Sequence, residues 1–162
     1  MQYKKESVKQ IKPEFLDFVN YGVCKALSER YGKEAAADLF RRAGEIEFEN
    51  LKRIIKFKCR EPYEVLRTVG KFLEEMGYMA KISLTKVEEG EVIIEMSGVS
   101  VIASSIRLTQ EGASPSHIMT NLMFAALKDF CNVRADIIDL TLEQPSSESG
   151  YAREKWILRK NE

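Results

Sequence analysis

The stretch Ala80–Met96, AKISLTKVEEGEVIIEM, contains the point at which the hydrophobic pattern of the chain changes. Ile82 and Leu84 alternate with polar residues, and a second alternating run, Val92–Met96, follows the polar connection Glu88–Gly90. Alternation with a period of two is typical of strands with one buried face, and a short connection that contains Gly is typical of a hairpin. The stretch therefore predicts a β-hairpin.

On the N-terminal side of this hairpin, apolar residues recur every three or four positions, which predicts helices. One helix is expected over Pro13–Arg30 and a second over Lys33–Lys56, and a third opens at Glu61–Pro62 and is capped by Gly77. Gly44 lies in the middle of the second helix, where Gly costs about 1 kcal/mol against Ala. We therefore expect another backbone to approach the helix closely at Gly44.

On the C-terminal side, the apolar segment 99–108 is interrupted by Ala103–Ser105 and fits a bent strand or a packed loop equally well. A further helix is expected to start with Ser114 as N-cap and Pro115 at its first position. Asn132 is expected to end this helix. Two more strands are expected at Ile138–Glu143 and around Lys155–Arg159, joined by the turn-rich stretch 144–150.

The order of these elements predicts an α+β fold. N-terminal helices should pack on one face of an antiparallel, roughly four-stranded sheet, with a helix inserted between two β-hairpins. Residues 1–12 form a polar N-terminal lead, and residues 13–162 are expected to form a single domain, since 162 residues suffice for one sizeable core.

The amino-acid composition excludes some classes of binding partner. The 25 Lys and Arg balance the 25 Asp and Glu, so no global basic field exists to hold nucleic acid, and we expect no direct nucleic-acid contact. The three Cys are odd in number and far apart, which fits a reducing cytoplasm. No apolar run approaches the ~18 residues of a membrane span. We therefore expect a cytoplasmic protein with no membrane span.

Motifs for catalysis are missing from the sequence. His117 is the single His, no Gly-x-Ser-x-Gly elbow is present, and no strand leads into a Gly-rich phosphate loop. We expect a non-catalytic protein without a cofactor. The Met and aromatic residues are more informative about function than these missing motifs, because thioethers and aromatic rings adapt to the shape of apolar ligands. Ordinary core packing explains the same residues and is the preferred explanation on this feature alone. The candidate ligand-binding residues are Phe40, Phe72, Met96, Met119, Met123 and Trp156.

Several segments together resemble the 4-vinyl-reductase domain family, also called hydrocarbon-binding domains, which is related in fold to subunits of the TRAPP vesicle-tethering complex. They are Tyr31–Ala35, Leu39–Gly44, Leu73–Tyr78 and the ending Leu142–Gly150 with Trp156. The resemblance covers most of the chain from about residue 13 and is diffuse. Only its C-terminal part is close to a motif.

In the phenol- and xylene-sensing members of the family, that C-terminal motif contains two Cys that hold a structural zinc. Glu143, Gly150 and Trp156 occupy the Glu, Gly and aromatic positions of the motif, but Ser146 and Glu154 replace the two Cys. A zinc site built on thiolates is therefore lost. His117, Glu143 and Glu154 could form a harder site for a divalent ion, or hydrogen bonds alone could hold the loop. The metal-free alternative is preferred, because three weak ligands without thiolate bind poorly.

The resemblance implies a free-standing sensor or carrier that binds a small apolar or aromatic ligand. A second hypothesis is a dimeric scaffold or assembly protein like the TRAPP subunits, with Phe15, Phe18 or Phe48 at its interface. A homodimer is expected under both hypotheses. A third possibility is an accessory factor for tetrapyrrole or other cofactor chemistry.

Overall fold

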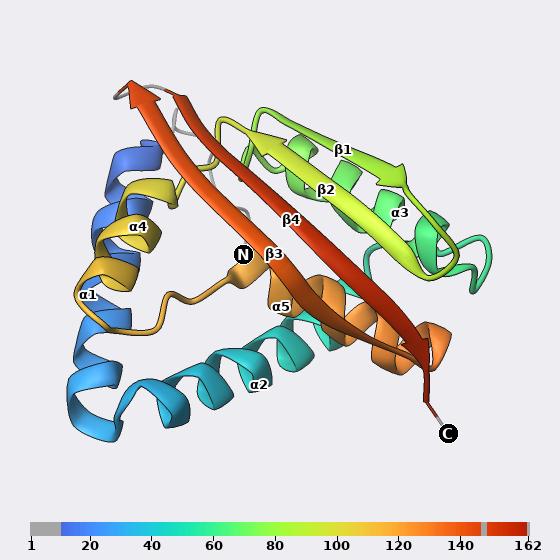
Figure 1. Cartoon of the computed structure of the whole chain (residues 1–162), viewed down its shortest axis with the longest axis horizontal. Coiled ribbons are helices and arrows are strands. Elements are labelled where there is room, and N and C mark those ends of the chain that lie inside the picture. The colour runs from blue at the N-terminus through green and yellow to red at the C-terminus, as the bar shows by residue number, and fades with distance from the viewer. Residues whose placement is uncertain (1–10, 147–148, 162) are drawn as a thin grey trace, which may run out of the picture.

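A computed structural model describes residues 11–146 and 149–161, so most of the polar lead lies outside the described residues. Helices and a four-stranded antiparallel sheet form an α+β fold, as predicted (Figure 1). In chain order the elements are α1 (Pro13–Tyr31), α2 (Lys33–Leu51), α3 (Pro62–Glu75), β1 (Lys81–Lys86), β2 (Glu91–Ser97), α4 (Ile102–Gln110), α5 (Ile118–Ala126), the π-helical turn η1 (Leu127–Cys131), β3 (Val133–Ser146) and β4 (Ser149–Lys160).

The strand order in the sheet is β1-β2-β4-β3, so β4 lies in the centre and β3 forms an edge. Figure 1 shows α1 and α4 side by side beyond one end of the sheet, while α2 runs beneath the sheet toward α5. The predicted hairpin is confirmed, with Ile82 opposite Met96 and Leu84 opposite Ile94. None of the described helices combines the length and the apolar character that crossing a bilayer requires.

The main core lies between the inner face of the sheet and the helices α3 and α5. Alternate residues of β2 are buried, as the period of two requires. Trp156 of β4 is fully buried and meets the Phe124 ring edge-on, with 4.7 Å between ring centroids. A smaller cluster forms between α1, α2 and α4 around Phe40 and Leu108. Packing of apolar side chains on a single face of the sheet therefore fixes how the helices are layered.

The predicted close approach at Gly44 is confirmed. A Cβ atom added to Gly44 would lie 2.6 Å from the carbonyl carbon of Asn121 in α5. Because real Cβ contacts are essentially never this short, only Gly allows α2 and α5 to pack at this distance. The contact connects the N-terminal helices to the helix that covers the sheet.

Helix α2 ends five residues earlier than its pattern predicts, at Leu51 and not at Lys56. The chain turns there, and the Phe57 ring packs back against Phe48 and Phe130, with centroid separations of 5.8 and 5.0 Å. Burial of Phe57 by residues from two other elements therefore overrides the local helical period.

The undecided segment 99–108 is neither a bent strand nor a loop, because helix α4 begins in it. Its Ser104 N–H donates to the Asp17 carboxylate of α1 at 3.0 Å, and the Ser104 and Ser105 hydroxyls donate to the Val101 carbonyl. Ser is a weak helix former whose side chain competes for backbone partners. The acceptor on α1 stabilises this helix, and no local pattern can reveal such a distant acceptor.

The prediction that α5 starts at Ser114 and Pro115 is wrong, because α5 starts at Ile118 after His117. The Ser114 N–H donates to the Ser28 hydroxyl of α1 at 3.0 Å, which holds this segment outside the helix. Asn132 ends the helical region, as predicted, in a left-handed conformation. β3 and β4 are both longer than their predicted strands.

Candidate functional site

The structure brings four of the six candidate ligand residues into the main core. Met96, Met119, Met123 and Trp156 are each no more than 3% exposed there. Phe40 belongs to the separate cluster between α1, α2 and α4. Phe72 is half-buried at the margin of the main core, so the six residues do not line one pocket.

Met96 and Met119 share a small cavity with Tyr78, His117 and Glu154. Its volume is about 30 Å³, which is enough for one or two water molecules and too small for an aromatic ring. An apolar ligand would have to displace some of the side chains that line this cavity in order to enter.

Glu154 is 2% exposed, and each of its carboxyl oxygens accepts one hydrogen bond. The Thr120 hydroxyl donates to Oε1 at 2.9 Å, and the Trp156 indole N–H donates to Oε2 at 2.7 Å. Burial raises the pKa of the Glu154 carboxyl above its usual range, while these two hydrogen bonds oppose the shift. Glu154 therefore orients Trp156 and Thr120 inside the core.

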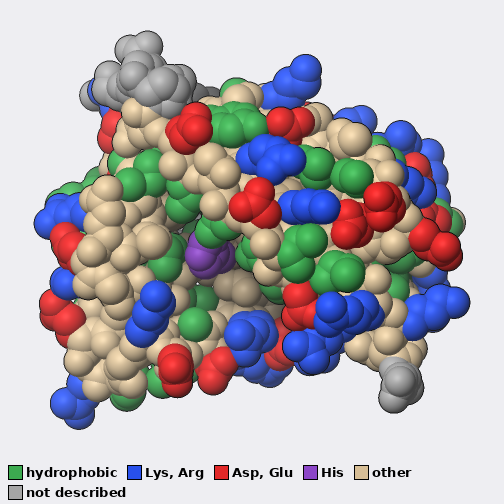
Figure 2. Space-filling view, in the orientation of Figure 1, with side chains coloured by type: hydrophobic (Ala, Val, Ile, Leu, Met, Phe, Trp, Pro, Cys, Tyr) green, Lys and Arg blue, Asp and Glu red, His purple; other side chains and the backbone are tan. Residues whose placement is uncertain are grey.

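His117 adopts a left-handed conformation with φ of 44° at the N-terminus of α5, and Figure 2 shows it at the bottom of a hollow. Burial lowers its pKa, which favours a neutral imidazole. His117 and Glu154 line one cavity, whereas Glu143 is exposed on β3 and Ser146 ends that strand. Within residues 11–146 and 149–161, no group of three or more His, Cys, Asp or Glu side chains could hold a metal ion.

Helix α1 carries a set of apolar residues that point away from the rest of the molecule. Phe18 is 74% exposed and Phe15 is 58% exposed, and a Cβ atom added to Gly22 would meet no other atom within 4 Å. Large apolar side chains exposed together mark interaction sites more often than single ones do. We call this set the outward face of α1; it comprises Phe15, Phe18, Val19, Gly22, Val23 and Ala26.

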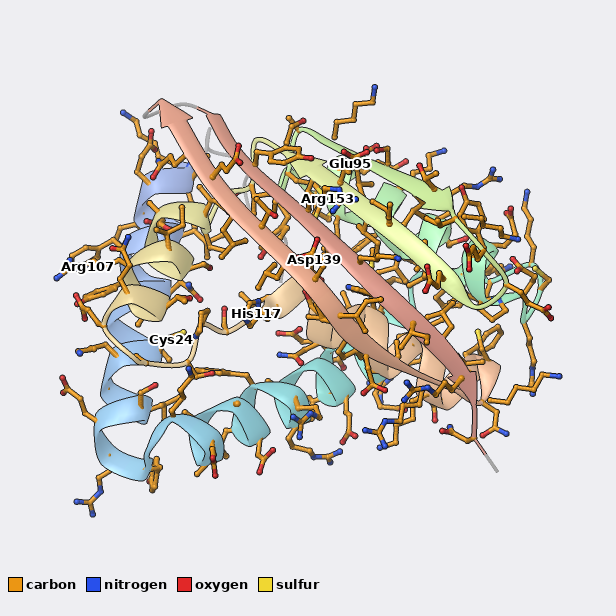
Figure 3. All side chains as sticks on the ribbon, viewed as in Figure 1. Cys24, Glu95, Arg107, His117, Asp139 and Arg153 are labelled. Carbon is orange, nitrogen blue, oxygen red and sulfur yellow. The ribbon has the colours of Figure 1, made fainter. Side chains whose placement is uncertain are left out.

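The opposite side of α1 carries buried polar groups that fix how the helix is turned. The Asn20 amide donates to the Ser104 hydroxyl at 2.8 Å and accepts from the Ser116 hydroxyl at 2.7 Å. The Cys24 thiol donates to the same amide oxygen, and Figure 3 shows Cys24 on the side of α1 that faces α4. Rotating α1 to bury Phe15 and Phe18 would expose these partners or leave them unpaired.

The helical spacing of Phe15, Phe18, Val19 and Val23 is visible in the sequence. Phe15 and Phe18 were predicted there as possible interface residues. The structure places both at the surface and buries Phe48, the third residue named with them, at 1% exposure. The sequence already indicated a second apolar face on α1, because the apolar residues of this helix occupy more than one of its sides.

The three free cysteines differ in exposure, which gives a test of the packing around α1. Cys24 is 1% exposed, Cys59 is exposed, and Cys131 is half-buried with a pKa raised by burial to about 11. Iodoacetamide at pH 8 should modify Cys59 first, Cys131 more slowly, and Cys24 at least about 100-fold more slowly than Cys59. Peptide mapping by mass spectrometry gives the order, and rapid labelling of Cys24 in the folded protein would contradict this packing.

Comparison with known proteins adds information at the level of the fold. No family model matches the chain, and no curated protein matches its sequence. A similar solved structure is that of a trafficking protein particle complex subunit 3 from Naegleria fowleri, described as covalently bound to palmitic acid. The TM-score is 0.56 at 14% identity, over 91% of this chain and 95% of that one. The predicted relation in fold to TRAPP subunits is confirmed, whereas membership of the 4-vinyl-reductase family stays a prediction.

Proposed function

We propose that this protein is an assembly module that forms a homodimer through the outward face of α1. The observation that carries the proposal is the exposure of Phe15 and Phe18 beside Val19 and Val23 on a helix whose other side is already packed. When a partner surface covers water-exposed aromatic rings, the free energy falls by about 25 cal/mol per Å² of apolar area buried. The three free cysteines are consistent with work in a reducing cytoplasm.

The sequence of this face is complementary to itself in an antiparallel pair of α1 helices. If the two-fold axis passes at Gly22, residue numbers that face each other add up to 44. Phe18 then lies opposite Ala26 of the second copy, and Glu14 lies opposite Arg30. The Phe18 ring would meet a small side chain, opposite charges would meet at the ends, and Gly22 would let the two backbones approach closely.

Replacing one ring by a charge should abolish this association. We expect Phe18→Glu to weaken the dimer by at least about 100-fold, because a symmetric interface contains the substitution twice and each copy buries an unpaired carboxylate. Sedimentation velocity over a range of concentrations measures the dimer dissociation constant.

The matched control is Ile54→Glu, which alters another exposed apolar residue, 70% exposed and outside α1. It should leave the dissociation constant unchanged. A monomeric wild-type protein at high micromolar concentration, or a dimer that Phe18→Glu does not weaken, would rule out the outward face of α1 as the interface.

A second candidate function is the binding of an apolar acyl chain, which the palmitic acid of the similar structure favours. Cysteine is a common site for covalent palmitate. Exposed Cys59 borders a surface groove of about 350 Å³ that also includes Ile55 and Phe72. An acyl chain on Cys59 could lie against these two apolar side chains without opening the filled core.

Mass spectrometry of protein purified from cells tests this candidate. Acylation on Cys59 should disappear with hydroxylamine treatment and in the Cys59→Ser variant, and Cys131→Ser should leave it unchanged. Protein that carries no acyl group, and that is not stabilised against heat by palmitic acid, would contradict the candidate.

A further inference from the structure

Two of the three cysteines belong to segments that pack against each other. Cys59 lies in the connection between α2 and α3, and Cys131 is the last residue of η1. The Phe57 ring of the connection packs on the Phe130 ring of η1, with 5.0 Å between centroids. The Arg60 guanidinium lies 5.3 Å from the centroid of that same Phe130 ring. Residues on both sides of Cys59 therefore touch the immediate neighbour of Cys131.

Two further observations agree with this placement. Lys52, at the start of the connection, forms an ion pair with Asp129 of η1 at 2.7 Å. Burial is the main cause that raises the pKa of Cys131, and the charge of Cys59 adds to the shift. The two thiols therefore border one contact between the connection and η1.

The backbone around Cys59 can adjust more easily than the backbone around Cys131. A disulfide requires a separation of about 4.4–6.8 Å between the two Cα atoms, so an adjustable segment favours its formation. Residues 56–60 belong to no helix or strand, and they form no backbone–backbone hydrogen bond within residues 11–146 and 149–161. Cys131 belongs to the hydrogen-bonded turn η1. Cys59 can therefore approach Cys131 without breaking a backbone hydrogen bond.

The surroundings of the two thiols differ in a way that assigns an order of reaction. Cys59 is exposed, and its neighbours Lys58 and Arg60 are exposed and positively charged. Reactive cysteines occur in exposed, electropositive surroundings of this kind. Cys131 is half-buried. A dissolved oxidant should therefore meet Cys59 first, and Cys131 should react second.

The third cysteine is placed apart from this pair. Cys24 is buried in the cluster between α1, α2 and α4, whereas Cys131 packs against the main core. The Cys24 thiol also donates a hydrogen bond to the Asn20 side chain. Cys24 therefore serves as an internal control in any experiment on the other two cysteines.

We propose that Cys59 and Cys131 form a reversible disulfide when the protein meets a small-molecule disulfide such as oxidised glutathione. The Cys59 thiol loses its proton to solvent and its sulfur attacks the glutathione disulfide, which breaks the S–S bond and expels one glutathione thiolate. Cys131 then loses its proton and attacks the Cys59 sulfur of the mixed disulfide, which expels the second glutathione thiolate. The two thiolates take up the two protons, so two protein thiols are oxidised and one glutathione disulfide is reduced.

The disulfide would give the protein a redox-controlled link between the connection and η1. It would also occupy the thiol to which the second candidate function assigns an acyl chain, so acylation of Cys59 and the disulfide exclude each other. This regulatory consequence rests on the second candidate function. The disulfide itself does not, because it can form in protein that carries no acyl group.

Peptide mapping of the full chain without reduction tests the proposal. Reduced protein is treated with oxidised glutathione, the remaining thiols are blocked, and the digest is analysed by mass spectrometry. The linked peptide Cys59–Cys131 should exceed every other linked peptide at least about 10-fold, and Cys24 should stay a free thiol. The oxidised protein should unfold at a temperature higher by at least about 5 °C, because the link restricts the unfolded chain. Dithiothreitol should reverse the shift.

Cys131→Ser should stop the reaction at the mixed disulfide on Cys59 and abolish the rise in unfolding temperature. In Cys59→Ser, glutathione should add to Cys131 at least about 10-fold more slowly than it adds to Cys59 in Cys131→Ser. The matched control Cys24→Ser should form the Cys59–Cys131 peptide as the wild type does.

Three results would overturn the proposal. They are glutathione that persists on Cys59 of the wild type, a link between Cys59 residues of two copies in place of Cys131, and a Cys59–Cys131 peptide that forms only in urea. A linked peptide in folded protein that is never acylated in cells supports the disulfide and contradicts only the second candidate function.

Discussion

Gly44→Ala should destabilise the protein by about 2 kcal/mol or more. Ala is favoured over Gly in a helix by about 1 kcal/mol, but here its methyl group would lie 2.6 Å from the Asn121 carbonyl carbon. A backbone atom cannot move aside as the end of a flexible side chain can, so α2 and α5 must separate. Overpacking of this kind costs typically about 1–3 kcal/mol and occasionally more. Urea denaturation followed by Trp156 fluorescence measures the loss.

Gly22→Ala is the matched control, because Gly22 also lies inside a helix but has no atom within 4 Å of the added methyl position. The free energy of unfolding of the Gly22→Ala variant should be about 0.5–1 kcal/mol higher than that of the unsubstituted protein. Both substitutions are best measured in the Phe18→Glu background, so that association of α1 helices does not contribute. A stabilising Gly44→Ala would show that α2 and α5 do not pack as described.

The second large effect is expected at Glu154, the buried carboxyl that accepts from Thr120 and Trp156. Glu154→Leu should cost roughly 2–5 kcal/mol, because it leaves the indole N–H and the Thr120 hydroxyl without an acceptor in the core. Glu154→Gln retains an acceptor for the indole and should cost less than about 1.5 kcal/mol at pH 5. Urea denaturation of both variants beside the wild type measures the difference.

The comparison of Glu154→Gln with the wild type should depend on pH. Because burial raises the pKa of Glu154 in the folded state, the folded protein binds this proton more tightly than the unfolded chain does. The stability from this group is fully present below the unfolded pKa of about 4.3 and is lost as pH rises through the folded value. Relative to the wild type, Glu154→Gln should therefore gain stability between pH 5 and pH 8. A constant difference over this range would show that Glu154 is not desolvated.

Local patterns predicted those parts of the fold in which local and tertiary preferences agree. The period of two around Ile82 and Ile94 and the helical periods before it identified the hairpin and α1, α2 and α3. The start of α5 was predicted wrongly, because the Ser114 N–H is bound by Ser28, 86 residues away. Such an acceptor lies outside any window in which a sequence pattern is evaluated.

The candidate sites were predictable to a smaller extent. Apolar character at Met96, Met119 and Trp156 was visible in the sequence, but their close packing leaves a cavity of only about 30 Å³. The apolar residues of α1 were visible as well. Which of them are buried depends on Asn20, whose polar partners come from α4 and from the segment before α5.

The sequence alone determined that α1 and the hairpin Ala80–Met96 form, because the spacing of apolar side chains along a chain fixes which faces can be buried. It also required a close backbone contact at Gly44, since Gly in a helix interior is costly without one. Only the tertiary structure decided that the outward face of α1 stays uncovered. Exposure depends on which distant elements arrive to cover a surface, and that is set by packing and hydrogen bonds across the whole fold.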